Sequence, residues 1–174
     1  SISVSQSGGL LAISGPVNNQ VESIVYDTSD FSVMATFPNL NNLVFSSDDS
    51  RIIGNNQGDI EIWDLSSKNV EMVIEGSANP IIELAWSSEK NEITVVDSEW
   101  NLFIWDSDTG IIKFTQQLPE PLFPSRVKLD YSPLSNYLSI TGFDSMIRVW
   151  DGEELSEING HSNIVTHSSW SPDE

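Results

Sequence analysis

The 174-residue sequence contains no cysteine and few basic residues, and both deficits narrow its range of functions. Without cysteine the chain can form no disulfide bond, thiolate nucleophile or cysteine-ligated zinc site. Seven Lys and Arg residues stand against 26 Asp and Glu residues, which gives a formal net charge of −19. Because phosphate backbones are bound through basic side chains, the sequence predicts no direct binding of nucleic acid.

Long apolar runs and secretory features are also missing. No stretch of 18 apolar residues occurs, so no membrane span is predicted. The sequence shows no basic-then-apolar leader and no Asn-x-Ser/Thr acceptor for glycosylation. Together with the lack of cysteine, these features favour an intracellular protein, cytoplasmic or nuclear. An apolar content of 39% is enough for the core of one globular domain.

Two series of residues recur through the sequence with a common period. The first is an aromatic residue followed by Asp, at Tyr26-Asp27, Trp63-Asp64, Trp105-Asp106 and Trp150-Asp151, with spacings of 37, 42 and 45 residues. The second series consists of residues that directly precede a Ser. They are Val4, Phe45, Trp86, Tyr131 and Trp170, with spacings of 41, 41, 45 and 39 residues. Two independent series that share a period of about forty residues indicate an internal repeat.

Within each repeat the apolar residues alternate as they do in β-strands. The positions one and three before the Trp are apolar in three repeats: Ile62 and Ile60, Ile104 and Leu102, Val149 and Ile147. A period of two places these side chains on one face of a strand. Turn-forming clusters separate the short strands, so we expect no helix longer than about two turns. Units of four strands must stack radially to bury their faces.

The Trp-Asp pairs and Gly160-His161 resemble those of WD-repeat proteins, in which Gly-His opens a repeat and Trp-Asp closes its third strand. The resemblance implies an all-β fold, a WD-type β-propeller. We expect residues 1–174 to form part of one propeller domain of about seven blades. The predicted blades are residues 1–37, 42–75, 81–118 and 125–159, followed by the first strand of an incomplete fifth blade at 160–174.

The sequence departs from this pattern at the start of most repeats. Gly-His occurs once, and other repeats open at Asn79-Pro80 and at residues 124–125. The resemblance implies a hydrogen-bond network that joins the His to a turn Asp and the strand Trp. Asp97 and Asp144 occupy the turn without an upstream His, so we expect their blades to depend on apolar packing.

The sequence offers little for catalysis. His161 is explained by the Gly-His signature, and His167 falls on a predicted strand, at a core or rim position. Residues 106–110 resemble a calcium loop, but their Gly is fifth instead of sixth, and a tight turn explains them. We therefore predict no catalytic residue, metal or cofactor, and no enzymatic activity.

Trp100 is the strongest candidate for a binding residue. Aligned on the strand Trp, its position holds Gly58 and Ser145 in the neighbouring repeats, where a small residue suffices. Exposed Trp is enriched in interface hot spots, and Glu99 and Asp97 would surround it with negative charge. The alternative is that the Trp100 ring folds back over the neighbouring blade. The sequence leaves both possibilities open.

These features predict a non-catalytic scaffold that binds other proteins, with basic partners favoured by the charge. Residues 138–151 and 165–170 further resemble WD-repeat proteins that assist complex assembly, which implies assembly of the endonuclease module of the Integrator complex. A propeller-based hydrolase and a reader of basic peptides, such as histone tails, are the alternatives. The reader would require acids and aromatic rings at the mouth of the central channel.

Overall fold

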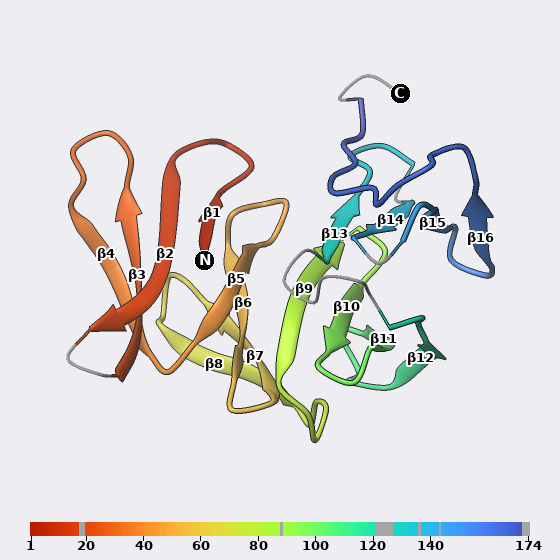
Figure 1. The fold of residues 1–174 in the computed structure, drawn as a ribbon. Coiled ribbons are helices and arrows are strands. Elements are labelled where there is room, and N and C mark those ends of the chain that lie inside the picture. The colour runs from red at the N-terminus through yellow and green to blue at the C-terminus, as the bar shows by residue number, and fades with distance from the viewer. Residues whose placement is uncertain (18–19, 88, 121–126, 136, 143, 172–174) are drawn as a thin grey trace.

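The computed structural model describes residues 1–17, 20–87, 89–120, 127–135, 137–142 and 144–171. These residues form sixteen strands in four antiparallel sheets, and none of them forms a helix (Figure 1). The described part of the chain therefore contains no helix that could cross a membrane. The prediction of a partial all-β propeller built from four-stranded units is confirmed.

Each sheet is a meander of four consecutive strands, which we call a blade. Blade 1 consists of β1 (Ile2–Val4), β2 (Leu10–Val17), β3 (Gln20–Asp27) and β4 (Val33–Pro38). Blade 2 consists of β5 (Asn41–Phe45), β6 (Arg51–Asn56), β7 (Asp59–Asp64) and β8 (Asn69–Ile74). Blade 3 consists of β9 (Ile81–Ser87), β10 (Glu92–Asp97), β11 (Asn101–Asp106) and β12 (Ile112–Gln117). Blade 4 consists of β13 (Lys128–Tyr131), β14 (Leu138–Thr141), β15 (Ile147–Trp150) and β16 (Leu155–Ile158).

The aromatic-Asp pairs mark the same place in each blade. Each pair lies at the end of the third strand, and in three blades the pairing with the fourth strand shifts register just before the aromatic residue, at Tyr26, Trp63 and Trp105. Such a shift bends the strand and re-aims the side chain. The sequence repeat therefore corresponds to a repeated backbone irregularity as well as to a repeated strand order.

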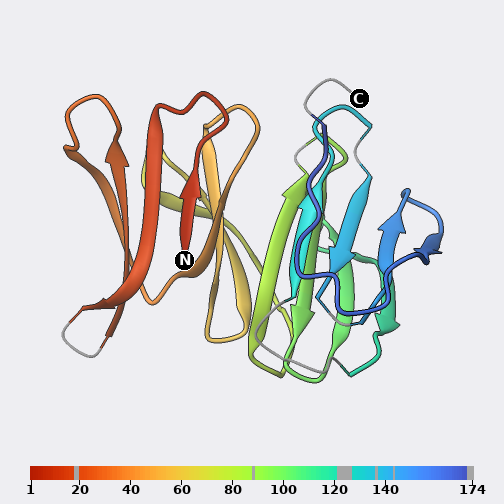
Figure 2. The ribbon, with the colours of Figure 1, turned by 45° about the horizontal axis from the view of Figure 1, so that its top comes forward.

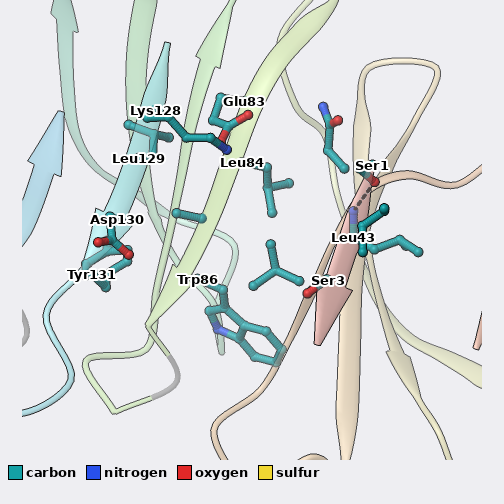
Figure 3. A pocket seen from close by; sticks show the side chains of 14 residues that line it. Ser1, Ser3, Leu43, Glu83, Leu84, Trp86, Lys128, Leu129, Asp130 and Tyr131 are labelled. Atoms are coloured by element: carbon teal, nitrogen blue, oxygen red, sulfur yellow. Dashed lines mark hydrogen bonds and ion pairs between the residues drawn. The ribbon is translucent and has the colours of Figure 1, made fainter. Parts of the chain in front are cut away.

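The first strand of every blade lies on the inside of the arrangement. β1, β5, β9 and β13 follow one another side by side, as the turned view shows (Figure 2). They enclose an open cavity of about 320 Å³ (Figure 3). The fourth strands lie farthest from this cavity, and their side chains are largely exposed.

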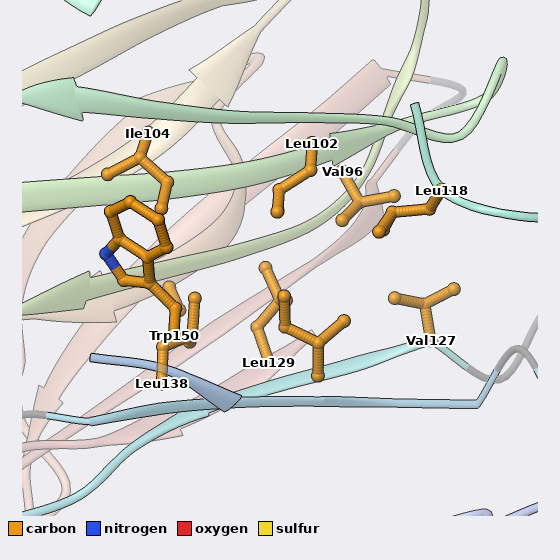
Figure 4. Packing of buried hydrophobic residues seen from close by; sticks show 10 residues of the cluster. Val96, Leu102, Ile104, Leu118, Val127, Leu129, Leu138 and Trp150 are labelled. Atoms are coloured by element: carbon orange, nitrogen blue, oxygen red, sulfur yellow. The ribbon is translucent and has the colours of Figure 1, made fainter. Parts of the chain in front are cut away.

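The hydrophobic cores lie between blades. Blades 1 and 2 share a cluster that includes Phe37 and Ile52, and blades 2 and 3 share one that includes Ile62 and Ile93. Blades 3 and 4 share the third, in which Leu102 and Ile104 face Leu138 and Trp150 (Figure 4). A four-stranded sheet has two faces, so each inner blade contributes one face to each of two clusters.

The first strand of the expected fifth blade is not formed. Residues 159–171 contain no strand, and they run back over blade 4 instead. The Val165 amide donates to the Asp144 carbonyl at 2.9 Å, and the Trp170 indole donates to the Asp130 carbonyl at 2.9 Å. A strand requires a neighbouring strand with which to form hydrogen bonds. The described residues after β16 form no strand with which this segment could pair. The segment satisfies its polar groups on blade 4.

Candidate interaction face

One side of the molecule carries both the connections between blades and the hairpins between second and third strands. We call it the linker face and define it by residues 39–40, 57–58, 75–80 and 98–100; it is the lower edge in Figure 1. The segment 75–80 is held between two hairpins. A side chain at Gly76 would clash with the Gly58 carbonyl on one side, and the Ser98 amide donates to the Pro80 carbonyl on the other.

Asp97 has a different role from the one predicted. It is fully buried, so a partner cannot reach it. Its carboxylate accepts hydrogen bonds from Ser77 Oγ at 2.6 Å, Asn79 Nδ2 at 3.1 Å and Asn101 Nδ2 at 3.0 Å. The backbone amides of Glu99 and Asn101 also donate to it, each at 2.9 Å. Asp97 is thus the organising centre of the linker face.

This network corrects the expectation that the blade would rely on apolar packing alone. The hydroxyl of Ser77 and the amide of Asn79 supply donors from the linker, where the family pattern has a His. Sequence reasoning missed Ser77 and noted Asn79 only as the opening of a repeat, because neither belongs to the Gly-His signature. The glycines Gly58 and Gly76 were the available signal, since each is required for the close approach of the linker.

The network also fixes the charge of Asp97. Burial pushes its pKa upward, but the hydrogen bonds from Ser77, Asn101 and Asn79 outweigh burial and hold the pKa below its usual range. Asp97 therefore stays ionised at neutral pH beneath the linker face. A buried carboxylate of this kind is stable only when donors surround it.

Trp100 lies in the turn after Asp97 and is partly buried. Its ring packs against the cluster between blades 3 and 4, as in the alternative that the sequence left open. Its backbone has a φ of +62°, a left-handed conformation that is unfavourable for a bulky residue. The Trp100 carbonyl accepts from the Leu118 amide at 2.9 Å, which ties the turn to the end of β12.

Glu99 is the exposed acid of this turn. Its backbone carbonyl accepts from Gln117 Nε2 at 2.6 Å, which anchors the backbone while the carboxylate stays in solvent. Of the three predicted binding residues, the structure therefore leaves Glu99 exposed and Trp100 partly exposed. It places Asp97 beneath them as their support.

The Asp residues of the Trp-Asp pairs close tight turns. Asp106 Oδ1 accepts from the Thr109 amide at 2.9 Å and from Thr109 Oγ1 at 2.8 Å, so the Asp-Ser-Asp-Thr-Gly segment is a turn. Asp64 accepts from the Ser67 amide and Asp151 from the Glu154 amide in the same way. Hydrogen bonds from Ser67 and Ser66 lower the pKa of Asp64 to about 2. No group of three metal-ligating side chains occurs among the described residues.

The three Trp rings face the preceding blade. Trp63 meets Phe37 of blade 1 edge to face, with ring centroids 4.9 Å apart, and its indole donates to Glu61 Oε2 at 2.8 Å. Trp105 is 2% exposed and lies in the cluster shared with blade 2. Trp150 packs against Phe114 of blade 3 at 4.3 Å. The structural role assigned to these residues by the resemblance fits their positions between blades.

Blade 4 stabilises its turn by a different pairing. Asp144 binds the buried guanidinium of Arg148 through both oxygens, at 3.1 and 2.8 Å, and Glu157 accepts from Arg148 Nε at 3.1 Å. The hydrogen bond from Arg148 lowers the pKa of Asp144. Gly160 and His161 are exposed, and His167 is exposed as well. Sequence reasoning noted Asp144 but missed Arg148, which supplies the donors four residues later.

Two acids, Glu83 and Asp130, and two aromatic rings, Trp86 and Tyr131, line the inner cavity in the described part of the chain. Trp86 is 7% exposed, and Tyr131 donates to or accepts from Thr94 Oγ1 at 2.7 Å. Glu83 pairs with Lys128 at 2.6 Å across blades 3 and 4 (Figure 3). The rings that line the cavity are therefore packed in the blades, and its acid at Glu83 is neutralised.

Comparison with known proteins agrees with this architecture. The family "WD domain, G-beta repeat" matches residues 123–151. A Retinoblastoma-binding protein 5 homolog of Drosophila melanogaster is 26% identical over 47% of this chain and 16% of its own length. The Target of rapamycin complex subunit LST8 of Mus musculus is 26% identical over 60% of this chain and 34% of its own. The Set1 complex component swd1 of Schizosaccharomyces pombe is 30% identical over 38% of this chain and 17% of its own length.

The chain thus spans at most about a third of the length of these three relatives. They do not show the narrower resemblance to WD repeat-containing protein 73, on which the Integrator assignment rested. Three observations point to the same kind of repeat. The chain forms four four-stranded blades, Trp-Asp pairs end three of the third strands, and the family match covers residues 123–151. The repeat matched at residues 123–151 and the similarity to these relatives support a WD-repeat β-propeller.

Proposed function

We propose that this chain is a non-catalytic scaffold that holds protein partners within a multiprotein complex inside the cell. Two of the relatives are named as a complex subunit and a complex component. The observation that carries the proposal is the linker face, where an exposed acid and a partly exposed Trp are mounted on a turn braced by Asp97. A rigid turn loses little conformational entropy when a partner binds.

The proposed contact is a central ring with an exposed acid beside it. Trp100 offers apolar surface, Glu99 offers charge, and the net charge of −19 favours a basic partner. The left-handed backbone at Trp100 supports this assignment, because glycine would fit the turn without strain. A strained residue at a surface turn is a reason to look for a function.

Replacing Trp100 by Gly and by Ala separates binding from stability. Both changes remove the ring, so both should weaken partner binding by about 2 kcal/mol, mostly through faster dissociation. Only Gly accepts a φ of +62° without strain, so Trp100→Gly should be about 1 kcal/mol more stable than Trp100→Ala. Affinity capture followed by dissociation kinetics, paired with thermal melts, measures both quantities.

If the ring served only the core, partner binding would follow stability, and the Gly variant would bind better than the Ala variant. Equal loss of binding at unequal stability supports the contact. Full binding by both variants would refute it.

Replacing Glu99 by Gln should act on the rate of association. The exposed carboxylate attracts a basic partner before contact, so its loss should slow association several-fold at low salt and leave dissociation nearly unchanged. Higher salt screens exposed charges, so the difference between Glu99→Gln and the parent should shrink. Association rates over a salt series test this, with the exposed Glu71→Gln on β8 as the control.

A further inference from the structure

An exposed joint connects the last strand of blade 4 to the segment that runs back over that blade. β16 ends at Ile158, and residues 159–161 are exposed and belong to no strand. A side chain built at Gly160 would meet no atom within 4 Å beyond its chain neighbours, so the joint is not packed against the blade. The Gly160 amide donates to no backbone carbonyl in the described part of the chain. With so few contacts, the joint can change its conformation in water.

The joint holds the only asparagine in the sequence that a glycine follows, Asn159. If the backbone nitrogen of Gly160 attacks the side-chain carbon of Asn159, a five-membered ring closes. Both reacting atoms belong to one short stretch of covalent structure, so the attack needs no bound catalyst or cofactor. Glycine favours the attack, because it has no Cβ to crowd its nitrogen and its backbone reaches conformations that other residues avoid.

We propose that Asn159 is a site of spontaneous deamidation, with water as the second reactant. A base removes the proton of the Gly160 amide, and the amide nitrogen bonds to the Asn159 side-chain carbon. The side-chain nitrogen takes up a proton and leaves as ammonia. Water then adds to one of the two ring carbonyls that flank the Gly160 nitrogen and opens the ring. One opening gives aspartate and the other gives isoaspartate, so either product replaces a neutral amide by a carboxylate.

The Asp151–Gly152 pair in the same blade shows how such a site is protected. Asp151 Oδ1 accepts from the Glu153 and Glu154 amides, each at 2.8 Å, which holds the carboxylate in the turn. The hydrogen bond from Glu154 is the main reason that the pKa of Asp151 is lowered. An ionised carboxylate held in this way resists attack by the next amide. Among the described residues, no hydrogen bond restrains the Asn159 side chain in the same manner.

Asn163 provides a control within the same segment. It is exposed like Asn159, but Ile164 follows it, and the branched Ile164 side chain crowds the amide that would attack. That amide also donates to Asn163 Oδ1 at 2.8 Å. Asn163 should therefore deamidate at least about tenfold more slowly than Asn159, which corresponds to a barrier higher by about 1.4 kcal/mol.

Deamidation changes the joint that positions the returning segment on blade 4. Beyond the joint, the Ser168 hydroxyl lies 2.8 Å from that of Ser139, and the Trp170 indole donates to the Asp130 carbonyl. Isoaspartate lengthens the main chain by one methylene group ahead of these contacts. Both products also add a negative charge to a chain that already carries a net charge of −19. The reaction is independent of the proposed scaffold function and does not involve the linker face.

The test incubates the full chain at neutral and at mildly alkaline pH and follows it by mass spectrometry. No Lys or Arg follows Arg148, so trypsin releases Asn159 and Asn163 in one peptide. Fragment masses should show hydroxyl in place of the side-chain NH2 at Asn159, and the rate should rise with pH because a base starts the reaction. Methyl transfer by a protein isoaspartate methyltransferase should detect isoaspartate in the aged chain and none in the fresh chain.

A synthetic peptide with the sequence of residues 155–163 gives the rate of the unprotected site, and the chain should react nearly as fast. Three results would overturn the proposal: Asn159 stays intact in the chain while the peptide reacts, Asn163 reacts as fast as Asn159, or aspartate forms without isoaspartate. Asn159→Gln keeps the amide but would have to close a six-membered ring, so it should stay unmodified under the same conditions. The comparison of parent chain and peptide needs no variant to fold.

Discussion

Asp97→Ala is expected to destabilise the chain by about 3 kcal/mol or more, the largest effect of any single polar substitution. The change removes a fully buried carboxylate and leaves the hydroxyl of Ser77 and the amides of Asn79 and Asn101, which are partly buried, without their acceptor. Each buried donor left unpaired costs about 1–3 kcal/mol before any relaxation. Urea unfolding followed by tryptophan fluorescence measures the loss.

Asp64→Ala is the matched control, since Asp64 also accepts from nearby Ser residues but lies in an exposed turn. Water can replace its hydrogen bonds, so its loss should cost well under half as much. Equal losses for the two variants would contradict the view that burial makes the Asp97 network important.

Asp97 should also contribute to the pH dependence of stability. Its pKa in the folded chain lies below the unfolded value of about 3.9. The unfolded chain therefore binds the proton more readily. This stabilisation is fully present above about pH 4 and is lost as the pH falls through the lower folded pKa. In Asp97→Asn, which cannot ionise, the acid-induced loss of stability should be smaller than in the parent.

Trp150→Ala is expected to destabilise the chain by about 3–5 kcal/mol and to loosen blade 4 from blade 3. The ring is 3% exposed and packs against Phe114 and Leu138 in the cluster between the two blades (Figure 4). Its removal leaves a cavity that rigid sheets on both sides cannot close. Equilibrium unfolding, with amide exchange of β13–β16 as the local readout, measures both effects.

Phe substitutions separate packing from hydrogen bonding. The Trp150 indole N–H has no partner among the described residues, so Trp150→Phe loses only part of the packing, about 1 kcal/mol. Trp63→Phe additionally loses the hydrogen bond to Glu61 Oε2. A Trp150→Ala variant as stable as the parent would mean that the cluster does not join the two blades.

The strand framework was predictable because the aromatic-Asp pairs sit at one fixed place in every blade. Ile60 and Ile62 are buried as the period-two pattern required, and the tight turn at Asp106 replaced the calcium loop as expected. These features depend on residues close together in sequence. Local spacing therefore determines them almost completely.

The polar centres were not predictable in the same way. Ser77 and Asn79 reach Asp97 across 20 and 18 residues, and the approach depends on the backbone contact of Gly58 with Gly76. A sequence does not state which of many Ser and Asn residues will meet a given Asp. The orientation of Trp100 was unpredictable for the same reason, because packing against the cluster between blades 3 and 4 decides it.

Each hydrophobic core of this chain lies between two blades, so the unit that packs as a core is offset from the unit that repeats in the sequence. A repeat read from the sequence begins and ends in a linker, whereas Phe37 with Trp63 and Phe114 with Trp150 each join two successive repeats. Duplication of one repeat therefore copies two half-cores and no complete one. An added blade can be accommodated only where its two faces match the blades on either side, so a new repeat must be compatible with both neighbours from the start.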